Sequence, residues 1–559
     1  MADSRWLIFR FSVSRRGAPA SAIFKIPFPP LHVSASRVPS SSRAKSSAAS
    51  SSASPLPLFN WLKERGAGVL LHPTALPGNQ GCGVFDQNAV RFLDFLQAAG
   101  MKYWQMCPLG PTGFGDSPYQ CYSAFAGNTS LVDLAPLVRY GLLQASDLTA
   151  FAALSADRVD FEGIAALKPQ LLQTAATLFR QKKPALPYGD YAAFCAREVH
   201  WLDDYALYRA AKDSCGGKPW WEWPAEMRDH RKATKSNLRA KLADAIESYR
   251  FGQYLFFGQW TELRSAAQAR GIQTIGDLPI FVAGDSADAW AHPELFELEA
   301  RTLLPVAVAG VPPDYFSADG QLWGNPLYVW SKHAADGYAW WCARLKASFD
   351  LYDVVRIDHF RGFESYWRVP LPATNARKGE WVPGPGLALF RAFQQAVPAA
   401  KIIAEDLGVL TPAVNELRAA TGLPGMLVLQ FAWGGDAQNS YLPHQASRNA
   451  VIYPGTHDND TTAGWYRAAS EHERDHVRRY LRISGEDIAW DFIRASYASP
   501  ARLAIVPLQD IFSLGSEARF NTPGLPSGNW RWRYRAEALE KISAGTAKYL
   551  TELAALTAR

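Results

Sequence analysis

Short apolar segments recur along the chain from residue 67 onwards, and helix-like segments separate most of them. Most lack the polar–apolar alternation of a half-exposed strand, so they are typical of parallel strands buried on both faces. Eight such strands with intervening helices predict an α/β fold, the (β/α)8 or TIM barrel, with a doubly wound open sheet as the alternative. The predicted strands are Ala67–His72, Met101–Pro108, Ile272–Gly276, Val354–Ile357, Lys401–Ala404, Met426–Phe431, Ala450–Tyr453 and Arg502–Pro507.

Carboxylates and histidines lie at or within a few residues after the ends of five of these strands. They are Asp277, Asp358-His359, Glu405-Asp406, His457-Asp458 and Asp510. Taken singly, each is more typical of a helix cap or a turn. In a barrel, however, the carboxyl ends of all strands meet at one mouth. Five polar positions at similar places therefore favour the barrel and predict a functional site at its mouth.

About 120 residues, 130–250, separate the second strand from the third, which is far longer than an ordinary connection. Helical patterns at Pro169–Lys182 and Tyr191–Lys212 indicate an inserted helical subdomain, with Pro169 in a first helical turn. After the last strand only about 50 residues remain, and they end in an amphipathic helix over Glu537–Leu556. The sequence therefore predicts no C-terminal β-sandwich domain.

The first 53 residues differ in composition from the rest. They hold eight Lys or Arg against a single acid, Asp3, and end in a Ser/Ala-rich run. Such a segment buries too little apolar surface to fold, and its composition is typical of an organellar transit peptide, with a disordered tail as the alternative. We therefore expect 1–53 to be a disordered transit peptide and 54–559 to be the catalytic domain.

The charge of the remaining 506 residues is −1, which argues against a nucleic-acid partner. The longest segment without Asp, Glu, Lys or Arg, Gly66–Phe85, contains a histidine, prolines and glycines, so no membrane span is expected. The six cysteines lack metal-ligand spacing, so neither a zinc site nor a disulfide framework is predicted.

Carboxylates at one mouth, without a phosphate-binding loop or a Gly-x-Ser-x-Gly motif, favour glycoside chemistry. Arg356 and Asp358 stand two residues apart on a strand, so both side chains can point to the barrel axis, where the guanidinium stabilises the ionised carboxylate. Glu405 follows an apolar segment, and desolvation favours its protonated form, as a general acid requires. Asp458, next to His457, supplies a third charge or hydrogen bonds to sugar hydroxyls.

Several sequence blocks, in order from about residue 60 to the C-terminus, resemble those of one enzyme family. The three central blocks are Val-Arg-Ile-Asp-His-Phe-Arg-Gly (355–362), Ala-Glu-Asp-Leu-Gly (404–408) and Gly-Thr-His-Asp-Asn-Asp-Thr (455–461). Others are Gly-Asp-Ser-Pro-Tyr-Gln (115–120), Pro-Pro-Asp-Tyr-Phe-Ser (312–317), Gly-Gln-Leu-Trp-Gly-Asn-Pro (320–326) and Asn-Thr-Pro-Gly (521–524). The chain resembles the 4-α-glucanotransferases, or amylomaltases, which form glycoside hydrolase family 77 of the α-amylase clan.

This resemblance implies a role for each matching residue. Asp358 matches the nucleophile that forms a covalent glycosyl-enzyme intermediate, Glu405 the acid/base, and Asp458 the carboxylate that holds and distorts the sugar. It implies no cofactor and no metal. Expected substrate contacts are Arg356, His359, His457, Tyr119, Asp277, Asp314, Tyr315, Phe316, Trp323 and Asn529.

The resemblance also implies transfer rather than hydrolysis. Donors and acceptors would be α-1,4-glucans and maltooligosaccharides, with glucose as acceptor or product. An aromatic loop carrying Tyr315 and Phe316 would cover the site and exclude water. The alternatives are an amylase-type hydrolase and a non-catalytic glucan-binding scaffold. With its leader, the chain is similar to plastidial members of the family, which implies a plastid location, and a homodimer stays open.

Overall fold

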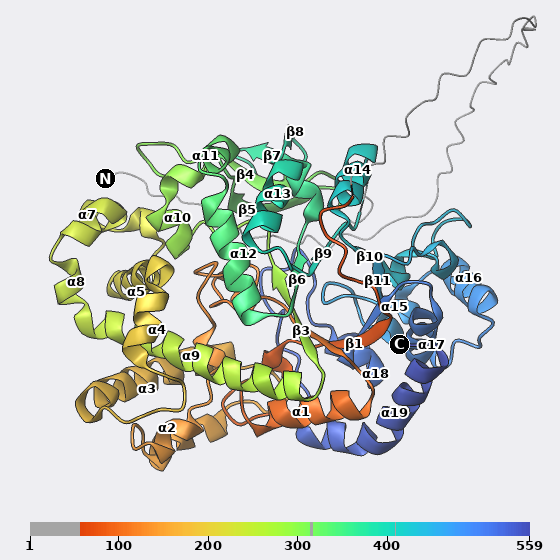
Figure 1. Cartoon of the computed structure of the whole chain (residues 1–559), viewed down its shortest axis with the longest axis horizontal. Helices are drawn as coiled ribbons and strands as arrows, with labels where there is room; N and C mark the ends of the chain where they lie inside the picture. The colour runs from red at the N-terminus through yellow and green to blue at the C-terminus, as the bar shows by residue number, and fades with distance from the viewer. Residues whose placement is uncertain (1–55, 314–316, 409) are drawn as a thin grey trace, which may run out of the picture. The chain divides into compact units, whose positions relative to one another are not determined.

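Eight parallel strands form the centre of the structure, a computed structural model that describes residues 56–313, 317–408 and 410–559 (Figure 1). Their order around the sheet is β10-β11-β12-β1-β2-β3-β6-β9. All eight predicted strands are present, and their bounds differ from the predicted ones by a few residues at most. They are β1 (Gly66–Leu70), β2 (Tyr103–Gln105), β3 (Gln273–Leu278), β6 (Val354–Ile357), β9 (Ile402–Ala404), β10 (Gly425–Val428), β11 (Ala450–Tyr453) and β12 (Leu503–Pro507).

The two end strands of this sheet, β9 and β10, approach each other at one seam. The Ala404 backbone N–H at the end of β9 donates to the Pro424 carbonyl, 2.9 Å away, directly before β10. The Asp406 side chain adds a second connection, because Oδ1 accepts from the Met426 N–H at 2.7 Å. The sheet is therefore a nearly closed barrel, which confirms the (β/α)8 prediction over the open sheet.

Side chains on the strands alternate between the barrel interior and the layer beneath the helices. Val354, Ile403 and Val451 belong to one buried cluster inside the barrel, whereas their neighbours on the same strands pack in the larger cluster outside it. One polar pair lies in this interior, where the Tyr453 hydroxyl donates to Gln105 Oε1 at 2.8 Å. Burial on both faces explains why these strands show little alternation in the sequence.

Helices cover the outside of the barrel, and the predicted C-terminal helix is present with its start one residue earlier, at Ala536. The helices that follow or flank the strands are α1 (Gln87–Ala98), α10 (Ala287–Ala291), α11 (Trp330–Ala335), α12 (Ala339–Leu351), α13 (Leu387–Ala396), α14 (Pro412–Thr421), α15 (Thr462–Ala468), α16 (Glu471–Leu481), α17 (Ile488–Ala498), α18 (Leu508–Ile511) and α19 (Ala536–Leu556). Among the residues described after β12 there is no strand. No helix in the described part of the chain has the length and apolar character to cross a membrane.

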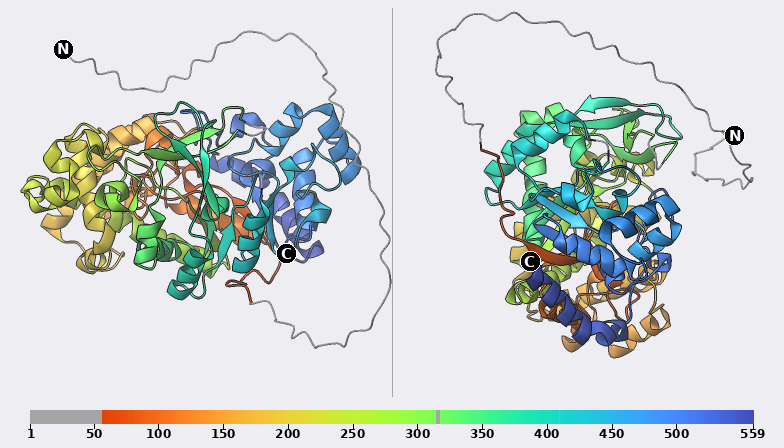
Figure 2. Two further views of the ribbon diagram at one scale, coloured as in Figure 1. Left: turned by 90° about the horizontal axis from the view of Figure 1, so that it is seen from above. Right: turned by 90° about the vertical axis from the view of Figure 1, so that its right-hand side faces the viewer.

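The connection between β2 and β3 is largely helical, as predicted. Its helices lie at one side of the barrel, and α15 to α17 lie at the other (Figure 2). They are α2 (Ala135–Arg139), α3 (Phe161–Lys182), α4 (Tyr191–Arg197), α5 (Val199–Ser214), α6 (Ala225–Arg228), α7 (His230–Lys235), α8 (Leu238–Lys241) and α9 (Ala243–Ala269).

Two predicted helix bounds in this insertion are wrong. Helix α3 begins eight residues before Pro169, because Asp160 caps it by accepting from the Gly163 N–H at 2.9 Å, and Pro169 lies inside the helix. The predicted helix Tyr191–Lys212 is two helices, α4 and α5, which meet at Glu198.

A second, four-stranded antiparallel sheet was not predicted. Its order is β5-β4-β7-β8, formed by β4 (Ala307–Val311), β5 (Gln321–Pro326), β7 (Ser365–Pro370) and β8 (Glu380–Pro383). Strands β4 and β5 lie between β3 and β6 in the chain, and β7 and β8 lie between β6 and β9. The small sheet is therefore formed by two of the segments that connect barrel strands at the mouth of the barrel.

Candidate active site

Arg356 on β6 connects two carboxylates at the mouth of the barrel. Its Nη1 lies 2.6 Å from Asp277 Oδ2 and 2.9 Å from Asp358 Oδ1. Arg356 and Asp277 are register partners on neighbouring strands, and Asp358 follows Arg356 by two residues, so the three side chains share the inner face. Asp277 and Arg356 are buried, whereas the Asp358 side chain is 26% exposed. Asp358 is therefore held by a guanidinium and still open to the mouth.

Glu405 follows β9 and is fixed by two backbone donors. The His359 N–H donates to Oε2 at 2.7 Å, and the Leu407 N–H donates to Oε1 at 2.9 Å. His359 adopts a left-handed conformation with φ 51°, in the turn where its N–H reaches Glu405. Burial raises the pKa of Glu405 to about 7, and the negative charge of Asp358 acts in the same direction. The carboxyl can therefore hold a proton near neutral pH.

Asp458 follows β11 and is the most exposed of the three carboxylates, with 47% of its side chain accessible. Asn521 Nδ2 donates to Asp458 Oδ1 at 2.6 Å, and Arg519 Nη2 donates to the Asp458 backbone carbonyl at 2.8 Å. His457 Nε2 lies 3.5 Å from the same Oδ1. The Asp458 carboxylate is therefore held through Oδ1.

Tyr119 connects the Asp277 side of the site with the His457 side. Its hydroxyl donates to Asp277 Oδ2 at 2.8 Å and lies 2.8 Å from His457 Nε2. The Tyr119 ring also stacks on the His457 ring, with centroids 5.3 Å apart and an interplanar angle of 16°. Trp530 packs against both rings at 5.9 Å. Residues from four separate segments therefore form one continuous polar wall.

Trp323 brings the small sheet into the site. Its ring meets the edge of His359 at 4.9 Å with an interplanar angle of 84°. Burial lowers the pKa of His359 to about 4, so its imidazole is neutral at pH 7 and can both donate and accept hydrogen bonds. The Trp323 indole ring and the neutral His359 imidazole, in contact with each other, are suited to contact a sugar.

One sequence-predicted residue, Asn529, has partners in its own loop, and three others lie outside the described residues. The Asn529 amide holds its own loop, since Oδ1 accepts from the Thr522 N–H at 3.0 Å, and its role in substrate contact stays a prediction. Asp314, Tyr315 and Phe316 lie outside the described residues.

Two of the carboxylates grouped with the site by their positions after strands have structural partners instead. Asp510 accepts from the Thr462 N–H and hydroxyl at the start of α15. Asp406 connects β9 to Met426 at the barrel seam. In these two cases the position after a strand does not mark a residue of the site.

Sequence reasoning missed Asn521 and Trp530 as site residues. Asn521 lies in a block that matches the family, so its position offered a signal, but its contact with Asp458 spans 63 residues of chain. Trp530 has a left-handed backbone, φ 64°, which no feature of the sequence indicates.

Three carboxylates and a buried guanidinium at the mouth of a (β/α)8 barrel supply the groups that enzymes acting on glycosidic bonds require. In the described part of the chain, no three His, Cys, Asp or Glu side chains are grouped as a metal site. The comparisons with known proteins agree with this class. The family model for 4-alpha-glucanotransferase matches residues 71–539, and the chain belongs to this family.

The relatives span bacteria and plants. The 4-alpha-glucanotransferase of Thermus thermophilus is 48% identical over 477 residues, which cover 84% of this chain and 94% of that protein. The chloroplastic/amyloplastic 4-alpha-glucanotransferase DPE1 of Arabidopsis thaliana is 42% identical over 485 residues, with coverage of 86% and 83%. Among solved structures, amylomaltase from Streptococcus agalactiae in complex with acarbose superposes with a TM-score of 0.84 at 36% identity, over 89% of this chain and 100% of that one.

Proposed function

We propose that this 4-alpha-glucanotransferase works by a retaining double displacement with Asp358 as nucleophile and Glu405 as acid/base. The observation that carries the proposal is the contrast between two neighbouring carboxyls. Asp358 pairs with the Arg356 guanidinium at 2.9 Å and has a partly exposed side chain, whereas burial raises the pKa of Glu405 to about 7. Such a separation of environments is what distinguishes a nucleophile from a general acid.

In the first step the Glu405 proton passes to the glycosidic oxygen of the donor as the bond from that oxygen to the anomeric carbon breaks. Asp358 forms the new bond to that carbon, which gives an ester. Arg356 holds Asp358 Oδ1, and within the described residues Oδ2 has no hydrogen-bond partner, so Oδ2 is the attacking atom. The departing glucan leaves with a new hydroxyl.

In the second step the 4-hydroxyl of an acceptor glucan attacks the same anomeric carbon. Its proton passes to Glu405, now ionised, and the ester to Asp358 breaks. Both carboxyls return to their starting states, and the configuration at the anomeric carbon is retained. We assign Asp458, fixed by Asn521 at 2.6 Å, to hold hydroxyl groups of the reacting sugar.

The substrates in this proposal are α-1,4-glucans and maltooligosaccharides, with glucose as acceptor or product. The family name and the binding of acarbose by the Streptococcus agalactiae amylomaltase support this choice. The test is incubation of the purified chain with maltotriose. We expect glucose and a ladder of longer oligosaccharides with little net gain of reducing ends, whereas a steady gain with only shorter products would contradict the proposal.

We also propose a plastid location, with residues 1–53 as transit peptide and residues 54–559 as the catalytic domain. The relatives from Arabidopsis thaliana and Solanum tuberosum are named chloroplastic/amyloplastic, and the basic, acid-poor leader is consistent with that address. A fluorescent protein fused behind residues 1–53 should accumulate in plastids, and a cytosolic signal would contradict the proposal. The homodimer stays a prediction, which light scattering of the purified chain would test.

A further inference from the structure

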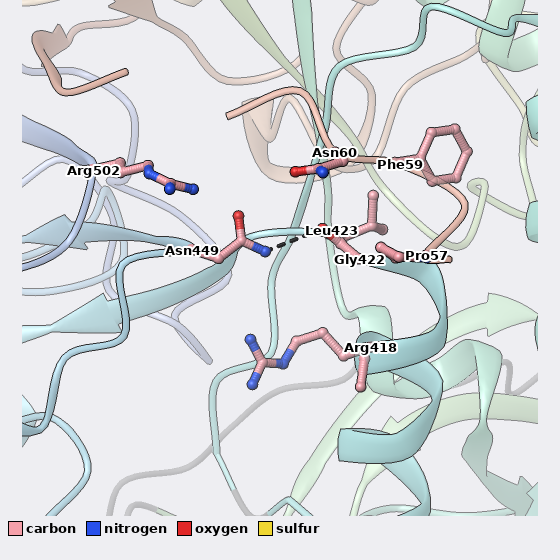
Figure 3. A pocket seen from close by; sticks show the side chains of 9 residues that line it. Pro57, Phe59, Asn60, Arg418, Gly422, Leu423, Asn449 and Arg502 are labelled. Atoms are coloured by element: carbon pink, nitrogen blue, oxygen red, sulfur yellow. Dashed lines mark hydrogen bonds between the residues drawn. The ribbon is translucent and has the colours of Figure 1, made fainter. Parts of the chain in front are cut away.

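Figure 3 shows a polar cavity that is lined by residues from segments preceding the barrel strands. Its volume is about 330 Å³, and its lining includes Leu423, Asn449 and Arg502, which directly precede or lie just before β10, β11 and β12. The site residues, in contrast, lie at or after the carboxyl ends of their strands. The cavity therefore belongs to the amino-terminal end of the barrel and is separate from the site.

Two guanidinium groups and two carboxamides surround this cavity. Arg502 directly precedes β12, Arg418 lies in the last turn of α14, Asn60 lies in the segment before β1, and Asn449 directly precedes β11 (Figure 3). In Figure 3 the Arg502 guanidinium and the Asn60 amide face the same space above Asn449, and the Arg418 guanidinium lies below it. Donors thus approach from different elements and directions.

These donors are only partly used by the protein. Arg502 Nη1 donates to the Leu62 carbonyl at 2.8 Å, and no partner within the described residues engages its other two nitrogens. Arg418 Nε lies 3.0 Å from Asp406 Oδ2, while its two terminal nitrogens have no partner within the same range of residues. Asn449 Nδ2 donates to the Gly422 carbonyl at 3.1 Å. Several N–H groups therefore remain for a ligand.

Positive charge around the cavity is not balanced by carboxylate side chains. Among the described residues, the acidic side chain that contacts an arginine of the cavity is Asp406, which pairs with Arg418. Behind Arg502, the guanidinium groups of Arg65 and Arg559 are held by backbone carbonyls, such as those of Thr557 and Gly66, and neither forms an ion pair within the described chain. The cavity is therefore an electropositive pocket with unused donors.

From this arrangement we infer that the cavity binds a phosphate group, as inorganic phosphate or as the phosphate monoester of a small molecule. Guanidinium groups and amide N–H groups, such as those that line this cavity, are donors that proteins use for phosphate oxygens. Because the donors come from several separate elements, they can approach a tetrahedral anion from different directions. A bound phosphate would connect the segment before β1 to α14 and β12.

The test is thermal unfolding of the full chain in increasing sodium phosphate, with sodium chloride added to keep ionic strength constant. A ligand that binds only the folded state raises the unfolding temperature in a saturable way. We expect this saturable rise for the wild type, and a titration with glycerol 3-phosphate shows whether a monoester binds more tightly than inorganic phosphate. The compound that raises the unfolding temperature at the lower concentration, inorganic phosphate or glycerol 3-phosphate, is the preferred ligand class.

Charge variants make the test specific. Asn60 is exposed and its side chain has no hydrogen bond within the described residues, so Asn60→Asp adds a repelling charge with little structural change. It should weaken the apparent affinity at least about 10-fold, as should Arg502→Gln. Asn237→Asp, at an exposed position of the insertion, changes the net charge equally and should bind as the wild type does. The absence of a saturable rise, or equal binding by Asn60→Asp, would overturn the inference.

Discussion

Glu405 is the residue whose environment determines how the enzyme should depend on pH. Burial raises its pKa to about 7, and the general acid must be protonated in the free enzyme. We therefore expect kcat/KM for maltotriose to fall as pH rises above about 7. Glu405→Gln, which can neither donate nor accept the proton, should lower kcat by about 100- to 10,000-fold. Initial rates between pH 5 and 9 measure both effects, and an unchanged rate up to pH 9 contradicts this role.

The same raised pKa has a consequence for stability. Because the folded pKa of about 7 exceeds the ordinary value of 4.5, the folded state binds the Glu405 proton more tightly than the unfolded state does. The stabilising contribution is present below about pH 4.5 and is lost as pH rises through about 7. Urea unfolding at pH 4.5 and pH 8 should show Glu405→Gln gaining about 3 kcal/mol relative to the wild type over this range. If the difference in unfolding free energy between Glu405→Gln and the wild type is the same at both pH values, Glu405 does not have this raised pKa.

Asn521 is the residue that sequence reasoning missed and that the structure connects directly to Asp458. Asn521→Ala removes the donor at 2.6 Å and frees the carboxylate to rotate. A hydrogen bond to a charged group contributes about 1.5–3 kcal/mol, so kcat/KM should fall about 10- to 100-fold. The melting temperature should stay close to that of the wild type, because Asp458 is 47% exposed and remains solvated. A normal kcat/KM would show that Asp458 needs no such support.

At the scale of elements, the seam between β9 and β10 depends on Asp406. Its carboxylate accepts from the Met426 N–H and lies 3.0 Å from Arg418 Nε, and its side chain is only 6% exposed. Asp406→Ala should lower the free energy of unfolding by about 3 kcal/mol. Asp244→Ala, which removes an acid that is 78% exposed, should cost less than about 1 kcal/mol. Equal effects of the two substitutions in urea unfolding would contradict this role for the seam.

The barrel strands could be predicted because burial on both faces leaves apolar segments such as Val354–Ile357, a signal contained within each strand. The small sheet could not. Its strands β4 and β7 pair across more than 50 residues of chain, and β8 is exposed along most of its length. The start of α3 was missed for a different reason, because Pro169 is tolerated inside the helix while the cap at Asp160 lies two turns earlier.

At the scale of the whole molecule, Leu56–Arg559 forms one compact unit, and its first segment is part of the fold. Phe59 and Leu62 are each 3% exposed, and Leu62 packs with the residues of the barrel interior. A chain that starts at residue 56 should therefore keep the activity and melting temperature of the full chain. A chain that starts at residue 64 loses both side chains and should be less stable by about 4 kcal/mol or more. Calorimetry of the full chain and of the chains that start at residues 56 and 64 measures their melting temperatures. A chain from residue 64 that is as stable as the full chain would contradict this role for the first segment.

The carboxylates of the site could be predicted from position, because parallel strands deliver their carboxyl ends to one mouth. The partners that orient them could not be predicted from spacing alone. Tyr119 reaches Asp277 over 158 residues, and the His359 N–H reaches Glu405 only because His359 is left-handed. Such contacts depend on how loops return to the mouth, which local sequence patterns do not determine.

The covalent ester on Asp358 is the central claim, and trapping it is the most direct test. With α-maltosyl fluoride as donor, fluoride leaves without help from an acid, so Glu405→Gln can form the ester but resolves it slowly. Mass spectrometry of the digested protein should then find one maltosyl group on the peptide that contains Asp358, and none in the Asp358→Asn, Glu405→Gln double variant. A maltosyl group on another residue, or fluoride release in repeated turnovers without any labelled peptide, would contradict the claim.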